Sequence, residues 1–517
     1  MTSTVQTRRT PAPPPGDLID SPAFPIAAKR ELGNEQLRDN LGRATATIRA
    51  KRNLRVSEVP QWEDLRQAAA AIKDRVAANL DTLLVQAEDN LTKAGVTVHW
   101  ARDADEANQI IVDLVKATGA TDVVKIKSMV TQEIDMNEAL ERAGIAAWET
   151  DLAELIVQLG HDRPSHVLVP AIHRNRTEIR DIFTREMGLY GKPAPEGLTD
   201  DPAALADASR QHLREKFLKA EVAISGGNFL VADTGTICIV ESEGNGRMCL
   251  TLPQTLISVI GIEKIVPTFD DLEVFLRLLP RSSTGERMNP YTSMWTGVTP
   301  GDGPQTMHVV LLDNGRTRVL ADPIGRQTLR CIRCSACMNI CPVYRMVGGH
   351  AYGSVYPGPI GICLTPQLRG FESAIDRSLP FASTLCGACV PVCPVKINFP
   401  DVIVHLRHEA ADYKHQLGGI HLEPLAMKAG SWAFDKGKHL TLVGKLTQVA
   451  GFVFGWRTHF GKLPWPASTW TRGRDLPVPA RQTFRTWWKK NRPVVNLYAS
   501  DTTIGRPPAH GQERAQR

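Results

Sequence analysis

Seven cysteines lie in two short runs whose spacing could hold metal clusters. The first run is Cys331-x2-Cys334-x2-Cys337-x3-Cys341, followed by Pro342, and the second is Cys386-x2-Cys389-x3-Cys393, followed by Pro394. In the first spacing, three thiolates bind one iron–sulfur cube, and the fourth cysteine, before a proline that turns the chain away, reaches a second cluster. The sequence therefore predicts two iron–sulfur clusters, each expected to be [4Fe-4S].

Under this rule the two runs exchange their last cysteines. The first cluster takes its ligands from both runs: Cys331, Cys334, Cys337 and Cys393. The second takes Cys341, Cys386 and Cys389 and lacks a fourth cysteine, because Ser383 stands three residues before Cys386. Three outcomes stay open: serine, water or a partner group on the fourth iron, a three-iron [3Fe-4S] cluster, or recruitment of Cys363. Soft iron prefers thiolate to hydroxyl, so Ser383 would be a weak ligand.

A zinc site or disulfides would be the alternative use of these cysteines. Zinc takes four tetrahedral ligands at each site, whereas the first run crowds its four cysteines in the manner of an iron–sulfur protein. The spacing therefore favours iron–sulfur clusters over zinc.

The charge of the chain is unevenly distributed. The net charge is +6, yet residues 431–517 hold 15 Lys and Arg against 4 Asp and Glu, a net of +11, which leaves −5 for the rest. Six of the ten tryptophans lie in the same segment: Trp432, Trp456, Trp465, Trp470, Trp487 and Trp488. Such a segment could contact nucleic acid, an anionic membrane or an acidic partner, or be a solvated basic face. Because the chain has no nucleic-acid-binding motif, a docking surface for another subunit is the preferred functional interpretation.

The sequence predicts a cytoplasmic protein. Arg8 and Arg9 are followed by prolines and acidic residues instead of an apolar stretch, which is unlike a secretory or twin-arginine signal. The longest apolar stretch, Leu440 to Phe454, is interrupted by Lys445 and is too short to cross a bilayer. Thiolate ligands also suit a reducing compartment.

Alternating helical and strand patterns predict one α/β domain over residues 60–313. It lies between a disordered Pro-rich tail at 1–25 and an iron–sulfur domain at 314–417, which is followed by a basic Trp-rich domain at 418–500 and a tail at 501–517. Strands are expected at 96–100, 122–127, 145–148, 166–169, 228–231, 236–242, 247–252, 257–265 and 308–312. Helices are expected at 67–94, 104–118, 131–143, 151–159, 203–219, 269–279 and 401–417. The glycine-rich segment 348–366 is expected to be a loop around a cluster.

The large domain shows no secure catalytic motif. It has neither a Gly-x-Gly-x-x-Gly in strand–helix context nor a Walker loop, which favours an electron relay over dinucleotide or nucleotide chemistry. Asp151 and Glu154, after Glu149 and Thr150, fit a helix cap. Other polar groups are weaker candidates for a pocket: Lys125, Lys127, Ser128, His173, Gly226 to Phe229, and Asp233 to Thr236. Cys238 and Cys249 are expected to be buried apolar residues.

The chain resembles the lactate-utilisation iron–sulfur protein B family. The matching segments are Lys127 to Met129, Glu149 to Leu152, Pro164 to His166, Pro170 to His173, Asp233 to Thr236, Arg330 to Cys334, Tyr356 to Gly361, Gly387 to Cys389, Pro394 to Ile397, Arg474 to Pro477 and Phe484 to Trp488. The resemblance implies a lactate-utilisation (LUD) domain with a fold like the NagB/RpiA/CoA-transferase group, then an α-helical ferredoxin-type module with two [4Fe-4S] clusters and a small basic C-terminal domain. It carries over the seven cysteines but not Cys363, and it implies no catalytic residue.

The resemblance further implies action with two companion proteins, a cysteine-rich subunit and a second LUD-domain subunit, in oxidising L-lactate to pyruvate. The leading hypothesis is therefore an electron-transfer subunit of an L-lactate dehydrogenase complex, with an unknown acceptor. One alternative is a pocket for another 2-hydroxy acid, formed by Lys127, His173 and the Asp233 turn. Another is a redox sensor that uses its incomplete second cluster.

Overall fold

The computed structural model describes residues 22–418, 422–454, 457–464, 468, 471 and 475–491. The chain divides into two units, residues 1–419 and 420–517. The predicted tail at 501–517 lies outside the described residues, as does the predicted tail at 1–25 up to residue 21; its end is helical, since α1 begins at Phe24.

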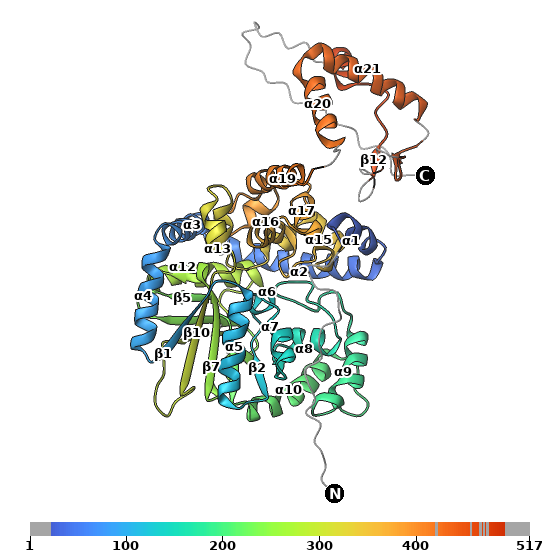
Figure 1. Cartoon of the computed structure of the whole chain (residues 1–517). Coiled ribbons are helices and arrows are strands. Elements are labelled where there is room, and N and C mark those ends of the chain that lie inside the picture. Colours follow the sequence, from blue (N-terminus) through green and yellow to red (C-terminus); the bar gives the residue numbers. More distant parts are fainter. Residues whose placement is uncertain are drawn as a thin grey trace. The chain divides into compact units, whose positions relative to one another are not determined.

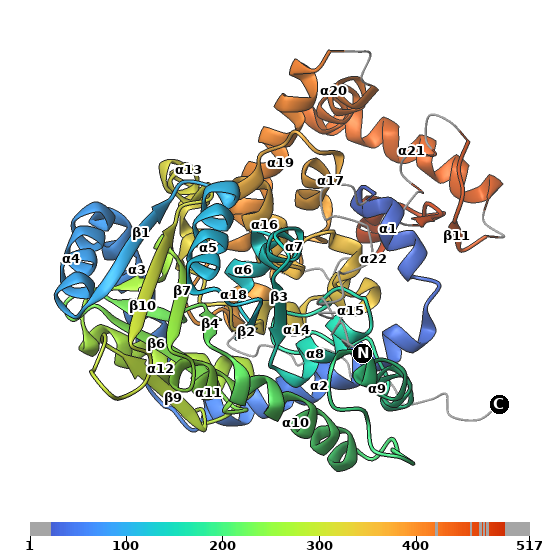
Figure 2. The same cartoon turned by 60° about the horizontal axis from the view of Figure 1, so that its bottom comes forward.

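The large domain, residues 62–312, is built on a six-stranded parallel sheet with the order β1–β10–β7–β4–β2–β3 (Figures 1 and 2). Its strands are β1 (Val96–Ala101), β2 (Asp122–Lys125), β3 (Ala146–Glu149), β4 (Val222–Ser225), β7 (Thr255–Gly261) and β10 (Thr306–Leu312). The inner strands β4 and β7 are buried along their whole length, as expected for parallel strands covered on both faces. A second, four-stranded sheet has the order β8–β5–β6–β9: β5 (Phe229–Val231), β6 (Thr236–Glu241), β8 (Ile265–Val266) and β9 (Tyr291–Trp295).

Helices cover both faces of the parallel sheet (Figures 1 and 2). They are α3 (Trp62–Ala78), α4 (Leu80–Lys93), α5 (Ala104–Thr118), α6 (Met129–Glu133), α7 (Met136–Arg142), α8 (Leu152–Leu159), α9 (Arg176–Tyr190), α10 (Pro202–Lys219), α11 (Asn245–Thr251) and α12 (Phe269–Ser283), with a 3-10 turn at Ile262–Lys264. Successive side chains of β2 pack into two different hydrophobic cores, one on each face of the sheet. Val123 packs in the core with α5 and α7, and Val124 packs on the opposite face.

Several expected elements differ in the structure. The helix expected at 67–94 is two helices, because Asn79 leaves the helical conformation and its side-chain amide donates to Arg75 O. The helix expected at 131–143 is likewise divided into α6 and α7, with Asp135 at a φ of 49°. The segment at 247–252 is helix α11 instead of a strand, since the Glu241 carboxylate accepts the first amides of this helix from Gly246 and Arg247.

The cysteine module, residues 313–418, is helical, and none of its residues forms a strand. Its elements are α13 (Arg316–Ala321), α14 (Ala336–Ile340), α15 (Pro342–Val347), α16 (Gly358–Arg369), α17 (Ala374–Ser378), α18 (Cys389–Val392) and α19 (Phe399–Gln416), with 3-10 turns at Gly325–Arg330, His350–Tyr352 and Leu379–Phe381. The predicted loop at 348–366 is therefore wrong in its second half, because α16 begins at Gly358. Two N-terminal helices that the sequence analysis did not assign, α1 (Phe24–Glu31) and α2 (Glu35–Ser57), pack on this module.

The segment at 166–169, expected to be a strand, connects the two domains instead. His166 is buried, and its Nδ1 accepts from the amides of Leu168 and Val169, so Nε2 donates to Asn339 of α14 at 3.1 Å. Ser165 accepts a hydrogen bond at its carbonyl from Tyr344 and at its hydroxyl from the Gly349 amide. The apolar alternation in this segment thus reflects packing on the cysteine module and not a sheet.

A buried charge network joins the large domain to the cysteine module. Arg316, at the start of α13, is 1% exposed and bonds Glu133 through both terminal nitrogens and Glu263 through Nε. Glu263 also accepts from Arg333 at 3.1 Å, and Glu133 accepts from the Tyr356 hydroxyl. The charges of Arg316 and Arg333 hold the pKa of Glu263 down to about 2, although burial alone would raise it.

Unit 2 consists of α20 (Leu422–Asp435), α21 (Gly437–Val453), α22 (Phe484–Asn491) and a short antiparallel pair, β11 (His459–Phe460) and β12 (Leu476–Pro477). It exposes large apolar side chains, among them Phe434, Phe452, Phe484, Trp487 and Trp488. None of the helices formed by the described residues is long and apolar enough to cross a bilayer.

We expect Arg316→Met to lower the free energy of unfolding by about 3–5 kcal/mol, because it leaves the buried Glu133 carboxylate without a cation and Glu263 with Arg333 alone. Arg326→Met, at an exposed position of the same module, is the matched control and should change stability by less than about 0.5 kcal/mol. Urea denaturation under anaerobic conditions measures both. Equal stability of the two variants would show that the network does not hold the junction.

Candidate iron–sulfur site

Four cysteines line a common cavity, here called the first cysteine cavity. They are the predicted ligands of the first cluster: Cys331, Cys334, Cys337 and Cys393. Cys334, Cys337 and Cys393 are each less than 9% exposed. The amide of Arg333 donates to the Cys331 sulfur and that of Ile397 to the Cys393 sulfur, both at 3.4 Å. A backbone amide that donates a hydrogen bond to a cysteine sulfur stabilises the thiolate form, which is the form that binds a cluster.

The other three predicted ligands line a second cysteine cavity: Cys341, Cys386 and Cys389. Ser383 lines the same cavity, and its hydroxyl accepts from the Leu385 amide at 3.1 Å. Cys386 is exposed, whereas three of the four cysteines in the first cavity are buried. Ser383 is therefore placed where the missing ligand would be.

Cys363 lies outside both cysteine cavities. It is fully buried in α16, on the apolar side of that helix. Burial and then the charge of nearby Cys389 raise the pKa of this thiol, yet Cys363 does not line the cavity that contains Cys389. We therefore propose that it is not a ligand.

Two short helices connect the cavities. Helix α14 carries Cys337 and ends at Cys341, while α18 begins at Cys389 and ends at Cys393, and the two helices are in contact. Each helix thus contributes one cysteine to each cavity. The four residues from Cys337 to Cys341 correspond to about 6 Å of helix rise, so the cavities are neighbours.

The spread of the sulfurs fits clusters better than single zinc ions. A tetrahedral zinc ion draws its ligand sulfurs to within about 4 Å of one another. Among the described residues, the trios of Cys, His, Asp and Glu whose ligand atoms lie within 4.8 Å are Asp162–His173–His350 and Asp322–His405–Glu409, and neither contains cysteine.

Two buried arginines support the second cysteine run. Arg66 of α3 donates to the carbonyls of Cys393 and Val390, both at 2.9 Å, and Arg52 of α2 donates to that of Val392 at 3.0 Å. Both side chains therefore place positive charge beside the first cysteine cavity. This charge would stabilise an electron-rich cluster, since net charge and hydrogen bonds tune cluster potentials.

The comparisons with known proteins agree with this organisation. The LUD domain family matches residues 84–312, and the 4Fe-4S dicluster domain matches residues 327–397. Lactate utilization protein B of Bacillus licheniformis is 42% identical over 465 residues, which cover 89% of this chain and 95% of that protein. The chain belongs to the lactate utilization protein B family. The protein of that name from Bacillus cytotoxicus is 40% identical over 437 residues, or 84% of this chain and 90% of the relative.

The resemblance found in the sequence is thereby confirmed, as is an α/β LUD domain followed by an iron–sulfur domain. A crystal structure of a DUF162 family protein from Deinococcus radiodurans aligns with 45% of this chain and 98% of its own, at 15% identity and a TM-score of 0.24. No conclusion rests on that likeness.

The predicted helix cap is present in the structure. The Asp151 carboxylate accepts from the amides of Ala153 and Glu154 at the start of α8. Behind the cap, Glu149 pairs with Lys125 at 2.6 Å, both side chains being buried. Glu154 is 3% exposed and accepts from Gln132. Burial first, and then the charge of Glu149, raise the pKa of Glu154 to about 7.

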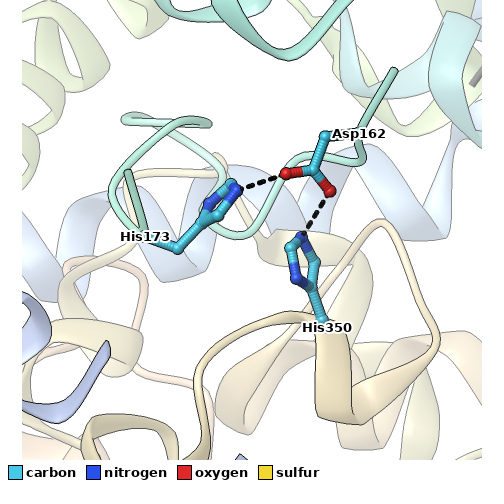
Figure 3. A group of neighbouring side chains, drawn as sticks. All are labelled: Asp162, His173 and His350. Carbon is cyan, nitrogen blue, oxygen red and sulfur yellow. Dashed lines mark hydrogen bonds and ion pairs between the residues drawn. The ribbon is translucent and has the colours of Figure 1, made fainter. Parts of the chain in front are cut away.

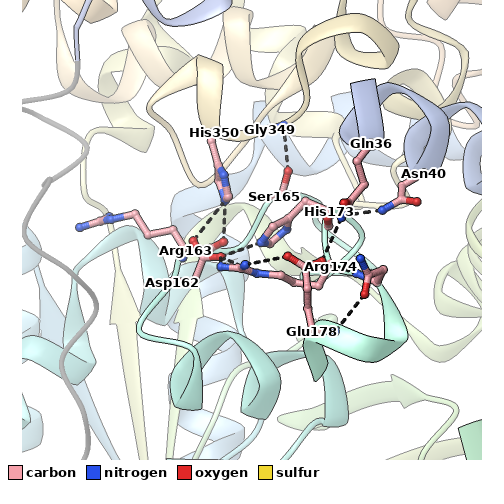
Figure 4. A network of polar contacts seen from close by, with 11 residues as sticks. Gln36, Asn40, Asp162, Arg163, Ser165, His173, Arg174, Glu178, Gly349 and His350 are labelled. Atoms are coloured by element: carbon pink, nitrogen blue, oxygen red, sulfur yellow. Dashed lines mark hydrogen bonds and ion pairs between the residues drawn. The ribbon is translucent and has the colours of Figure 1, made fainter. Parts of the chain in front are cut away.

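His173, a candidate pocket residue, follows the segment at 166–169, which is not the expected strand. Its Nε2 bonds the Asp162 carboxylate at 2.7 Å, and His350 of the cysteine module stands beside both (Figure 3). Arg174 donates to the same carboxylate oxygen of Asp162, while His350 Nε2 donates to Arg163 O at 2.7 Å (Figure 4). These partners hold the pKa of Asp162 below its usual range despite burial. Because the ligand atoms already have partners, the trio is interpreted as a junction contact and not as a metal site.

The three residues expected to form one pocket are separated in the structure. Lys127 donates to Leu168 O and lines a cavity together with Ser128. Asp233 lies at the turn before β6, where Asn90 donates to its carbonyl. Cys238 and Cys249 are both fully buried, as predicted.

Several residues of the junction were missed by the sequence analysis: Glu133, Glu263, Lys264, Arg316 and Arg333. Glu263 and Lys264 fell inside an expected strand at 257–265, whereas β7 ends at Gly261 and a 3-10 turn follows. Two adjacent charges at the end of an apolar run were the available signal for this turn.

We predict that Cys389→Ala loses the iron of the second cluster, whereas Cys363→Ala keeps the iron content of the unmodified protein. Both positions are cysteines of the same module, so the second variant is the control for losing a sulfur. Iron, acid-labile sulfide and EPR of anaerobically purified protein, before and after dithionite, measure the outcome. Iron loss in Cys363→Ala would show that α16 supplies the fourth ligand.

The raised pKa of Glu154 predicts a pH-dependent stability. In the range from about pH 4.5 to 7, the folded state holds a proton that the unfolded state has lost, so stability falls as pH rises. The free energy of unfolding is expected to fall by roughly 2–3 kcal/mol over this pH range, and Glu154→Gln should abolish this decrease. Denaturation at pH 5.5 and pH 8 measures it, with the exposed Glu196→Gln as control. A parallel pH dependence in wild type and Glu154→Gln would contradict the assignment.

Proposed function

We propose that this chain is the electron-transfer subunit of a cytoplasmic multi-protein system that oxidises L-lactate to pyruvate. Its relatives carry the name lactate utilization protein B, and the dicluster domain supports iron–sulfur chemistry. The cysteine-rich subunit and the second LUD-domain subunit expected from the sequence resemblance would be its partners. A cytoplasmic location is supported by the need of thiolate ligands for a reducing compartment.

The observation that carries the proposal is the unequal exposure of two neighbouring cysteine cavities. Three of the four cysteines in the first cavity are buried, whereas Cys386 in the second cavity is exposed. Electron transfer slows steeply with distance, so a relay needs closely spaced sites and one exposed end. The α14 and α18 pair provides the spacing, and Cys386 marks the exposed end.

Bound clusters would supply one-electron chemistry at these cavities. The residues around the first cavity would exclude water and, through Arg52 and Arg66, stabilise the reduced state. The loop that carries Leu385 and Cys386, both exposed, would be the surface on which an electron partner docks. Electrons would then enter on the side of the large domain and leave on the side of Cys386.

The test mixes the anaerobic full-length protein with its purified companion proteins, L-lactate and an artificial electron acceptor. We expect cluster reduction, pyruvate formation and acceptor reduction together. In Cys389→Ala the first cluster should still be reduced, while acceptor reduction should fall at least tenfold; Cys363→Ala should behave as wild type.

Clusters that stay oxidised with L-lactate and both companions would refute the proposed role. Full acceptor reduction by Cys389→Ala would refute the direction of the relay. If another 2-hydroxy acid reduced the clusters and L-lactate did not, the electron-transfer role would stand and the proposed substrate would be wrong.

A further inference from the structure

A cavity of about 310 Å³ lies where the large domain meets the cysteine module; it is called the strand-end cavity here. Segments that follow three adjacent parallel strands line it: Ile126 to Val130 after β2, Asp151 after β3, and Gly226 to Asn228 after β4. Parallel α/β sheets bind ligands at the carboxyl ends of their strands. The cavity therefore occupies the position at which such a sheet binds a small molecule.

The opposite wall of this cavity comes from the first cluster's own ligand loop. Ile332 and Arg333, which lie between Cys331 and Cys334, line both the strand-end cavity and the first cysteine cavity. Val167, from the segment that connects the domains, also lines both. A molecule in the strand-end cavity would thus be separated from the first cluster by a single layer of residues.

Two polar side chains in this cavity lack partners although they are buried. Lys264 is 7% exposed, and no hydrogen bond joins its ammonium to any of the described residues. Asn289 is 8% exposed, and its amide oxygen accepts no hydrogen bond. Burying an unpaired ammonium or amide is costly. The Asn289 amide oxygen has almost no accessible surface, so the group that remains available to a ligand is the Lys264 ammonium.

The remaining charged groups of the lining already have partners or contact solvent. Lys127 donates to Leu168 O, and Arg333 bonds Glu263. The Asp151 and Glu241 carboxylates accept helix amides, and Glu243 is exposed. Lys264 is thus the lining cation without a partner among the described residues, which favours an anionic ligand.

We propose that the strand-end cavity binds a small hydroxy acid whose carboxylate pairs with the Lys264 ammonium. The volume also admits hydroxy acids longer than lactate. The choice of L-lactate as the first probe rests on the proposed function, whereas the cavity and its two unpartnered groups do not. This binding step involves no transfer of electrons, so it can be measured without the companion proteins.

The experiment titrates L-lactate into the full-length, cluster-loaded protein by calorimetry, with propane-1,2-diol as the analogue that lacks the carboxylate. L-lactate should bind and the diol should not. Lys264→Met should weaken binding about tenfold or more, because a charge-assisted contact is lost. Lys219→Met, at an exposed position of α10, is the control and should leave binding unchanged.

Asn289→Asp is a second variant, in case Lys264→Met does not fold. Its added negative charge should also weaken binding of a carboxylate. A further readout is the EPR spectrum of the reduced first cluster, which L-lactate should shift in wild type but not in Lys264→Met. This shift separates ligand contact at the cluster wall from a general loss of fold.

Absence of L-lactate binding up to about 10 mM, well above the usual KM range, together with no binding of longer 2-hydroxy acids, would overturn the proposal. So would equal affinity in wild type and Lys264→Met. Either result could occur while the protein still transfers electrons with its companion proteins. The experiments therefore distinguish an error in the proposed ligand binding from an error in the proposed electron transfer.

Discussion

The Glu263 carboxylate is the point on which the junction of the two domains depends. It is buried with Arg316 and Arg333 on either side, and Lys73 donates to its backbone carbonyl. Such a network is costly to desolvate, and its members are worth most when all are present. Arg333 lies between Cys331 and Cys334, two predicted ligands of the first cluster, so the same network that joins the domains also holds the loop that carries these cysteines.

In agreement with this coupling, the large domain and the cysteine module belong to one compact unit, which ends at residue 419. The buried apolar residues of the cysteine module belong to the same hydrophobic core as those of the large domain. The large domain supplies Val167 and Glu263, and the N-terminal helices supply Arg52. The cluster sites are therefore products of the whole unit and not of the cysteine motif alone.

The sequence predicted the cysteine chemistry well because ligand spacing is a local property. It also predicted β1, α5 and α10 nearly to the residue, since these have clear periodicity and caps such as Asp103 and Asp201. Prediction failed where tertiary contact overrides periodicity. His166 to Val169 reads as a strand but packs on α14, and the segment around Cys249 reads as a strand but is capped as a helix by Glu241.

The pocket residues were predicted only in part for the same reason. Lys127 and Gly226 to Asn228 follow strands, so their position near a sheet edge could be inferred. Lys264 and Asn289 could not be placed, because one lies in the 3-10 turn after β7 and the other in the irregular segment between α12 and β9, where strand or helix periodicity gives no position. The segment before His173 is not a strand, so the expected strand at 166–169 does not position this residue.

The exchange of cysteines between α14 and α18 has a consequence for how this module can change during evolution. Deleting either cysteine run would remove predicted ligands from both cysteine cavities, so a deletion of that size could not be confined to one cluster. A one-residue insertion in α14 would rotate Cys341 by about 100° relative to Cys337, and the two cysteines would no longer face their separate cavities.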